Sequence, residues 1–324
     1  MCYPPAGFHL GRFAKGFNTM KHFPFPPSGS SDRLTSATAA FRRVEKHLLA
    51  SFEAAGFEEV HPPLVDAADA FAFAGEELPK LIGPDGQILA LRADFTGPIV
   101  RMAASRYGKQ ETPLKLSYVG PVFRYRNGFR EFYQAGVELF DAPPEEATLS
   151  IVQLALHTLE SLGLRPFVVL GSNAILHALL PHASEALRHA FARKSLTQLE
   201  EQCALDDIPK ATSSALAALL SLAGGAEVLQ RASSQLPSVC KNALNTLAQL
   251  LAQLPGKHIG VDLALVRPPS YYGGVVFDVF VEGVPKAVAG GGRYDALTRR
   301  FGAERTAVGV TFDLEALCSL GGPS

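Results

Sequence analysis

The chain is poor in the features that mark several common classes of protein. It has four cysteines in 324 residues, and none of them forms a C-x-x-C pair. That scatter argues against a zinc site or a disulfide framework and fits a reducing cytoplasm. A net charge of −1 gives no electrostatic argument for binding nucleic acid. No apolar run is long enough to act as a secretion signal or to span a membrane, so we expect a cytoplasmic protein.

What the chain does contain is enough apolar material for a large core. Hydrophobic residues make up 47% of the sequence and charged residues 19%, a balance typical of soluble globular proteins. The length suits one large domain or two moderate ones. Residues 1–31 are rich in proline, glycine and aromatics and are predicted to form a flexible N-terminal extension. Met1 and Met20 both qualify as the start of translation.

Hydrophobic periodicity and turn residues predict an α+β protein with an antiparallel sheet flanked by helices. We expect a core of residues 32–171 and 258–324, interrupted by a helical insertion at 172–257. Asp32 is expected to cap the first helix and Gly56 to end it. The predicted elements, in order, are helix 34–55, strand 57–61, hairpin 80–82 and 87–91, helix 96–108, a hairpin within 120–140, helix 143–162, strand 166–170, short helices over 172–254, strands 258–266, 274–282, 286–289 and 306–311, and helix 313–320.

The stretch Gly120–Phe140, GPVFRYRNGFREFYQAGVELF, carries the most chemical information. Asn127-Gly128 is a strong signal for a turn between two strands. Because side chains alternate along a strand, Gln134 and Glu138 share one face, with Gly136 between them. A small polar ligand could lie over that glycine, held at two ends roughly 13 Å apart. Taken alone, a solvent-facing strand of a half-exposed sheet explains the alternation at least as well.

Four segments of the chain resemble class II aminoacyl-tRNA synthetases. The hairpin is similar to the second signature motif of that class in its histidyl form, and AGGGRYDAL at 289–297 and AVGVTFDLEAL at 307–317 agree with it. LRADFTGPIVR at 91–101 resembles the ATP phosphoribosyltransferase regulatory subunit, a non-synthetase relative of histidyl-tRNA synthetase. Each segment is weak as a motif, but four in the right order are strong. The resemblance implies a class II synthetase-like catalytic-domain fold. Helix 34–55, the strand after it and Pro62-Pro63 resemble the first class II motif, which builds the dimer interface in that family. An ordinary amphipathic helix on a sheet explains the periodicity equally well.

The resemblance also implies a site for free histidine. A zwitterion that carries an imidazole needs a mixture of charged and polar groups, because each buried charge must be paired. Asp94 and Thr96 are equally interpretable as caps of the helix that begins there, and the two roles are compatible. The implied ligand residues are Arg124 for the carboxylate, Asp94, Thr96 and Gln134 around the ammonium, and Glu138 and Tyr272 for the imidazole, with Arg267 and Tyr271 from the matching segment 265–272.

That site sets a condition on the central hairpin. With a plain two-residue turn at Asn127-Gly128, Arg124 would face away from Gln134 and Glu138. A loop with an odd number of residues places Arg124 on their face. We therefore predict a three-residue loop with Gly128 in the left-handed conformation.

Groups that would serve ATP in a synthetase are changed in this chain. Ala316 stands where the third motif would place an arginine, and Arg126 where the second motif would place a glutamate. Pro268-Pro269-Ser270 replaces a segment that would hold an aspartate. Gly290-Gly291-Gly292 lacks the spacing of a phosphate-binding loop and fits an ordinary strand-to-helix turn. Only seven residues follow Leu317, where a synthetase would continue into an anticodon-binding domain.

This pattern of retained and lost groups predicts a histidine sensor without catalytic residues, cofactor or metal of its own. By resemblance it is a regulatory subunit that transmits histidine feedback inhibition, and activation, to a separate short-form ATP phosphoribosyltransferase catalytic subunit at the first step of histidine biosynthesis. In the family the assembly is a hetero-octamer, within which we expect this chain to dimerise. The alternative is a trimmed histidyl-tRNA synthetase or another amino-acid-activating ligase, an interpretation that Arg124, Arg267 and Arg293 keep open.

Overall fold

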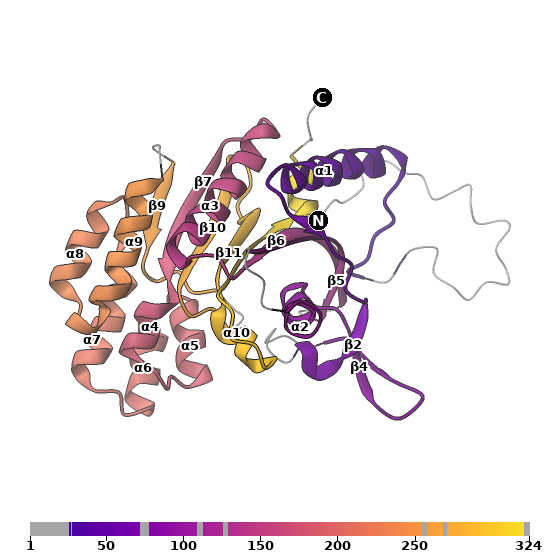
Figure 1. The fold of residues 1–324 in the computed structure, drawn as a ribbon. Coiled ribbons are helices and arrows are strands. Elements are labelled where there is room, and N and C mark those ends of the chain that lie inside the picture. The colour runs from indigo at the N-terminus through magenta and orange to yellow at the C-terminus, as the bar shows by residue number, and fades with distance from the viewer. Residues whose placement is uncertain are drawn as a thin grey trace, which may run out of the picture.

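The structure is a computed structural model in which a large mixed sheet is flanked by helices (Figure 1). The described residues form nine strands of the large sheet, in the order β1-β5-β6-β12-β11-β10-β7-β9-β8, and a separate small sheet with the order β2-β4-β3. Strand pairs of the described residues are antiparallel except β1 with β5 and β7 with β9, which are parallel. The structure describes residues 26, 28–71, 78–108, 113–125, 129–254, 258–267 and 271–320.

The elements follow the predicted order closely. The strands are β1 (Glu58–Glu59), β2 (Val65–Ala67), β3 (Lys80–Ile82), β4 (Ile88–Leu91), β5 (Leu114–Tyr125), β6 (Phe129–Phe140), β7 (Pro166–Ser172), β8 (Ala223–Gly224), β9 (Ile259–Asp262), β10 (Val275–Val281), β11 (Ala289–Arg293) and β12 (Ala307–Asp313). The helices are α1 (Thr35–Ala54), η2 (Ala68–Phe71), α2 (Thr96–Arg106), α3 (Pro144–Ser161), α4 (Asn173–Leu179), α5 (Glu185–Ala192), α6 (Leu196–Leu205), α7 (Lys210–Leu219), α8 (Glu227–Gln235), η3 (Ser238–Cys240), α9 (Lys241–Gln253), α10 (Asp295–Arg300) and α11 (Leu314–Cys318).

Helix α1 forms because apolar residues recur at helical spacing and bury one face. Phe41, Val44, Leu48 and Phe52 of this helix are buried, and Gly56 follows it with a φ of +81°, as expected of a helix-terminating glycine. The predicted cap is wrong, however. The helix begins at Thr35 after an extended Leu34 and has no side-chain cap, which leaves Asp32 outside the position from which a carboxylate can bond the first turn.

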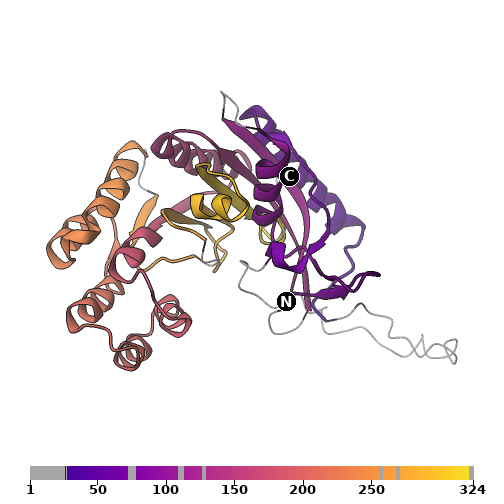
Figure 2. The same cartoon turned by 60° about the horizontal axis from the view of Figure 1, so that its bottom comes forward.

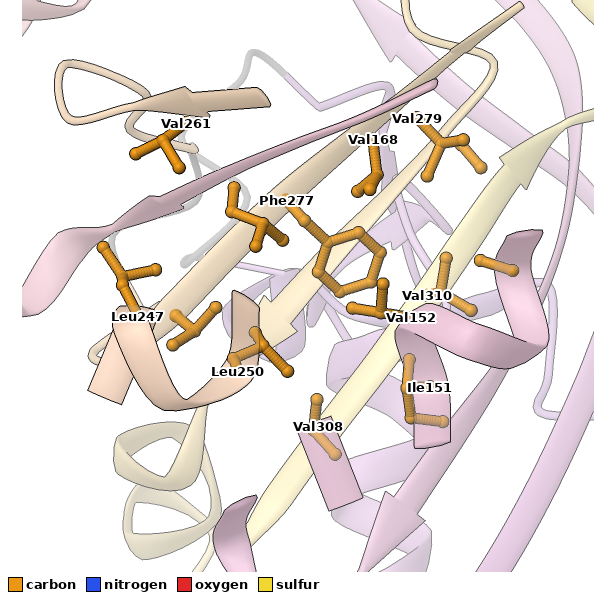
Figure 3. Close-up of a cluster of buried hydrophobic side chains, with 14 of the residues drawn as sticks. Ile151, Val152, Val168, Leu247, Leu250, Val261, Phe277, Val279, Val308 and Val310 are labelled. Carbon is orange, nitrogen blue, oxygen red and sulfur yellow. The ribbon is translucent and has the colours of Figure 1, made fainter. Parts of the chain in front are cut away.

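The large sheet has an apolar core on each face. On one face, α1, α3 and α9 pack against alternate residues of β6, β12, β10 and β7. Figure 3 shows part of this core, where Ile151 and Val152 of α3 and Leu250 of α9 lie against Phe277 and Val310 of the sheet. On the other face, α2 and α10 pack against a smaller, aromatic-rich cluster. This second face carries the predicted ligand residues.

Helices α4 to α9 gather at the end of the sheet that carries β9, away from α1 and α2 (Figures 1 and 2). Ser184 and Ser195 cap α5 and α6 by accepting bonds from backbone N–H groups. The buried apolar residues of α4 to α9 belong to the same core cluster as those of α3. Among the residues that the structure describes, no helix is long and apolar enough to cross a membrane.

The triple glycine corrects the prediction for the third late strand. The strand covers Ala289–Arg293 instead of 286–289, so the glycines lie inside it and not in a turn. A side chain at Gly291 would place its Cβ 1.9 Å from the carbonyl oxygen of Gly309 on β12. The two strand backbones approach too closely there for any residue with a Cβ atom.

Candidate functional site

The register of the central hairpin places Arg124 on the predicted face. Tyr125 pairs with Phe129, so three residues separate the two strands, and Arg124 lies opposite Arg130. The prediction of an odd-numbered loop is confirmed by this register. The loop itself, residues 126–128, lies outside the described residues, and so does the conformation expected of Gly128.

Glu138 forms the centre of the site. Its side chain is 1% exposed. The hydroxyl of Thr96 donates to Glu138 Oε1 over 2.8 Å, and the hydroxyl of Tyr294 donates to Oε2. Burial raises the pKa of Glu138 to about 8, although the two hydroxyl donors oppose that rise.

The sequence allowed Asp94 and Thr96 either to cap α2 or to contact the ligand site, and in the structure each residue takes one of these roles. Asp94 Oδ1 accepts a bond from the N–H of Gly97 over 3.2 Å and so caps α2. Thr96 is the first residue of that helix and turns its hydroxyl to Glu138. The charge of Asp94 contributes to the raised pKa values of Glu138 and Tyr272, as expected of a neighbouring carboxylate.

Three buried tyrosines close the site beside Glu138. The ring centroids of Tyr271 and Tyr272 are 4.9 Å apart, and both lie within 6.3 Å of the ring of Tyr294. Burial is the main cause of the raised pKa of each phenol. Tyr271 and Tyr272 were predicted from the sequence. Tyr294 was missed as a site residue, although its motif, AGGGRYDAL, was noticed.

Tyr118 occupies the space that the sequence suggested for a ligand. A Cβ at Gly136 would lie 2.4 Å from the Tyr118 hydroxyl, so the ring covers that glycine. The hydroxyl also bonds Thr311 over 2.7 Å, and Phe95 stacks on the ring at 4.3 Å. The idea of a ligand lying over Gly136 is therefore wrong, because an aromatic side chain from the neighbouring strand fills the gap.

Arg124 and Gln134 lie on the same face as Glu138. Arg124 Nε donates to the carbonyl of Ala93 over 2.9 Å, and its guanidinium is 5.0 Å from the ring centre of Phe132. Gln134 is half-buried. These contacts hold Arg124 near the start of α2, next to Asp94.

Arg267 lies beside the tyrosines and is paired with a residue that the sequence analysis missed. It forms an ion pair with Asp278 of β10 and packs over Gly290. Its Nε is buried and has no hydrogen-bond partner among the described residues. The charge of Arg267 lowers the pKa of Tyr272 against the effect of burial. The segment 268–270 between them lies outside the described residues.

Ala316 stands at the start of α11, where a synthetase would place an arginine. This residue is buried, and its N–H bonds Asp313 Oδ1 at the start of α11. Arg126, the other changed position, lies outside the described residues. Within the part of the chain that the structure describes, no three histidine, cysteine or acidic side chains gather as a metal site would require.

Comparison with known proteins gives consistent results. A family model described as histidyl-tRNA synthetase matches residues 29–317. A protein of Moorella thermoacetica named ATP phosphoribosyltransferase regulatory subunit is 35% identical over 312 residues, which cover 90% of this chain and 80% of that protein. A protein of the same name from Symbiobacterium thermophilum is 34% identical, over 90% of this chain and 78% of its own length.

Solved structures agree. A Bacillus halodurans structure titled ATP phosphoribosyltransferase regulatory subunit/histidyl-tRNA synthetase superposes with a TM-score of 0.80 at 27% identity, covering 93% of this chain and 83% of that one. A histidine–tRNA ligase subunit from Alicyclobacillus acidocaldarius gives 0.78 at 26% identity, covering 93% and 98%. The predicted class II synthetase-like fold is confirmed by these matches.

Proposed function

The chain belongs to the family of ATP phosphoribosyltransferase regulatory subunits, which share the histidyl-tRNA synthetase fold, and we propose that it senses free histidine. In this proposal, bound histidine inhibits a phosphoribosyltransferase whose active site lies on a separate, short-form catalytic chain. The same subunit also supports the activity of that partner when histidine is scarce. The work is done in the cytoplasm, at the first step of histidine biosynthesis.

The observation that carries the proposal is the environment of Glu138. The Glu138 carboxyl group is buried, and Thr96 and Tyr294 each donate a hydrogen bond to one of its oxygens, so it is pre-oriented to bond a ligand with its remaining lone pairs. Its raised pKa lets it share a proton with an imidazole, which titrates near neutral pH. A group with these properties selects imidazole over the side chains of other amino acids.

The remaining groups fit the rest of the ligand. Arg124 would pair with the carboxylate of histidine, because its planar guanidinium matches a carboxylate geometrically. Asp94, Thr96 and Gln134 would surround the ammonium group. Tyr272 would share the imidazole with Glu138, while Tyr271 and Arg267 form the adjoining wall. This division of roles places each charge of the zwitterion against an opposite charge or a hydrogen-bond partner.

Two features argue against amino-acid activation. Ala316 offers no charge to a triphosphate. Gly292 of β11 pairs with Gly309 of β12, which in turn pairs with Glu138 of β6, so these three residues share one face of the sheet. Arg293 follows Gly292 and therefore points to the other face, where it cannot contact ATP bound beside Glu138. A ligase of the histidyl-tRNA synthetase type remains the second candidate, supported only by Arg124 and Arg267.

The partners follow from the same proposal. The chain would form a dimer within a hetero-octamer that also contains the catalytic subunits. No nucleic acid or membrane is needed, and neither a cofactor nor a metal takes part.

Calorimetric titration with L-histidine tests the proposal directly. Glu138→Ala would leave an imidazole N–H unpaired, and losing a bond to a charged group costs roughly 1.5–3 kcal/mol. We therefore expect histidine to bind the wild type and to bind the variant about 10- to 100-fold more weakly. Glu131→Ala is the matched control, since Glu131 lies on the same strand and faces the other way. Equal affinity of Glu138→Ala and wild type would mean that the ligand lies elsewhere or is not histidine.

A further inference from the structure

A second recess lies on the opposite face of the sheet from Glu138. It has a volume of about 260 Å³ and lies between the start of α3, one face of α9 and the ends of β7, β10 and β11. Small-molecule sites begin at about 300 Å³. The recess therefore suits a ligand with few heavy atoms.

The lining of the recess is polar at the points where a ligand would be held. Ser172 is 2% exposed, and its side chain does not cap α4, which begins at the next residue. The Ser172 side chain lines the recess, and its hydroxyl makes no hydrogen bond to another of the described residues, so it is available to a ligand there. A ligand hydroxyl that enters the recess could bond it.

Arg293 supplies the positive charge. Its side chain is 13% exposed, and one of its five N–H donors bonds Asp295 over 2.5 Å. The side chain runs along Gly274, which also lines the recess. The first turn of α3 has no side-chain cap and adds the positive end of an 18-residue helix, although Glu145 and Glu146 in that turn offset part of its charge. Glu145 at the same turn is the one carboxylate in the lining, and it disfavours a ligand with several negative charges.

From this arrangement we infer a second binding site, for a small organic anion that carries hydroxyl groups. Its acidic group, a carboxylate or a phosphate, bonds Arg293. Its hydroxyl groups bond Ser172 and the side-chain amides of Gln249 and Gln253 on α9. This ligand is distinct from histidine, because the recess lies on the far face of the sheet from Glu138.

The two sites share backbone. Gly274 and Arg293 line the recess, while Tyr272 and Tyr294, close to them in the chain, lie beside Glu138. Asn173, which follows Ser172, bonds the carbonyls of Gly274 and Tyr272. An anion that fixes this junction therefore changes the affinity for histidine, and the effect is reciprocal. The coupling rests on the proposed function, whereas binding of the anion does not.

The full-length protein is titrated calorimetrically with glycerol phosphate and with glycerate, first without histidine. These probes have similar size and hydroxyl content but differ in the acidic group, so they separate a phosphate site from a carboxylate site. Ala243→Met fills the recess from α9, whereas Ala248→Met places the same side chain on the exposed side of that helix. Ser172→Ala removes the unpaired hydroxyl without filling any space.

We expect saturable binding of at least one probe to the wild type and to Ala248→Met. Ala243→Met should lose at least tenfold in affinity, and Ser172→Ala about 2- to 10-fold. The bound probe should change the histidine affinity of the wild type but not that of Ala243→Met. The inference fails if neither probe binds saturably at millimolar concentration, or if Ala243→Met and Ala248→Met bind alike. Binding without any effect on histidine would overturn the coupling. Because the probes are first titrated without histidine, their binding can be measured even if the protein does not bind histidine.

Discussion

At the scale of single residues, the account depends on a carboxyl group that is more costly to ionise in the folded protein than in the unfolded chain. Glu138 is surrounded by Thr96, Tyr118, Tyr294 and the tyrosine pair, with Asp94 as the nearby charge. Desolvation dominates, so its pKa rises to about 8. In the proposed complex, a carboxyl group with this pKa could exchange a proton with the imidazole of histidine.

This raised pKa predicts a pH dependence of stability. Between a pKa of about 4.5 in the unfolded chain and about 8 in the fold, the folded state binds more protons. Stability from this group is therefore fully present below pH 4.5 and is lost as the pH rises through 8. Glu138→Gln keeps the shape without the charge. We expect the variant to gain a few kcal/mol of unfolding free energy relative to wild type between acidic and alkaline pH. Parallel stability curves, measured by denaturant titration, would show that Glu138 is not desolvated as described.

At the scale of the elements, the site depends on close approach of strands β5, β6 and β12. Gly136 on β6 lies beneath the ring of Tyr118 and against the backbone of β12. A Cβ there would come 2.3 Å from the carbonyl oxygen of Val310. The backbone of β12 cannot move aside without breaking its register with β6.

Gly136→Ala is accordingly predicted to be destabilising. Overpacking of a well-packed core typically costs about 1–3 kcal/mol, and the displaced Tyr118 should also weaken histidine binding. Gly108→Ala is the control, because nothing lies within 4 Å of a Cβ at that position. Thermal unfolding and histidine titration of the two variants make the comparison. A Gly136→Ala protein as stable as Gly108→Ala would contradict the close packing of these strands.

Local patterns in the sequence predicted most of the helices and strands, and also the odd number of residues in the loop of the central hairpin. Alternation placed Gln134 and Glu138 on one face, and the requirement that Arg124 join them led to the odd-numbered loop that the register confirms. The predictions that were wrong concern contacts between segments that are distant in the sequence. The ring over Gly136 comes from another strand, and no local signal reports it.

The same limit explains the other misses. The glycines of β11 look like a turn until the backbone of β12 is placed against them. Tyr294 and Asp278 become site residues only when β10, β11 and β6 are assembled. Residue type favours Asp32 as a cap, but the helix begins further along the chain, at Thr35. Residue type and spacing fix the elements, whereas partners across the sheet complete the site.

At the scale of the whole molecule, we propose that the fold of an amino-acid-activating enzyme keeps groups suited to the amino acid, while Ala316 and Arg126 replace groups that would serve ATP. The protein alone is therefore predicted to be inactive in ATP–pyrophosphate exchange with histidine. Ala316→Arg should not restore exchange, because Arg126 and Ser270 also depart from the synthetase pattern. Exchange at a rate typical of synthetases would contradict the sensor proposal and favour an amino-acid-activating ligase. A synthetase of the same fold assayed in parallel provides the positive control.

The central claim is that histidine bound beside Glu138 inhibits an active site on another chain. Such feedback is a coupling free energy, typically about 1–3 kcal/mol, and substrates of the catalytic subunit should weaken histidine binding by the same factor. The most direct measurement is phosphoribosyltransferase activity of the catalytic subunit, assembled with wild-type or Glu138→Ala protein, across a range of histidine concentrations. We predict equal activation by both proteins without histidine, and inhibition that needs about 10- to 100-fold more histidine with the variant. Identical inhibition curves, or no inhibition with the wild type, would contradict the account.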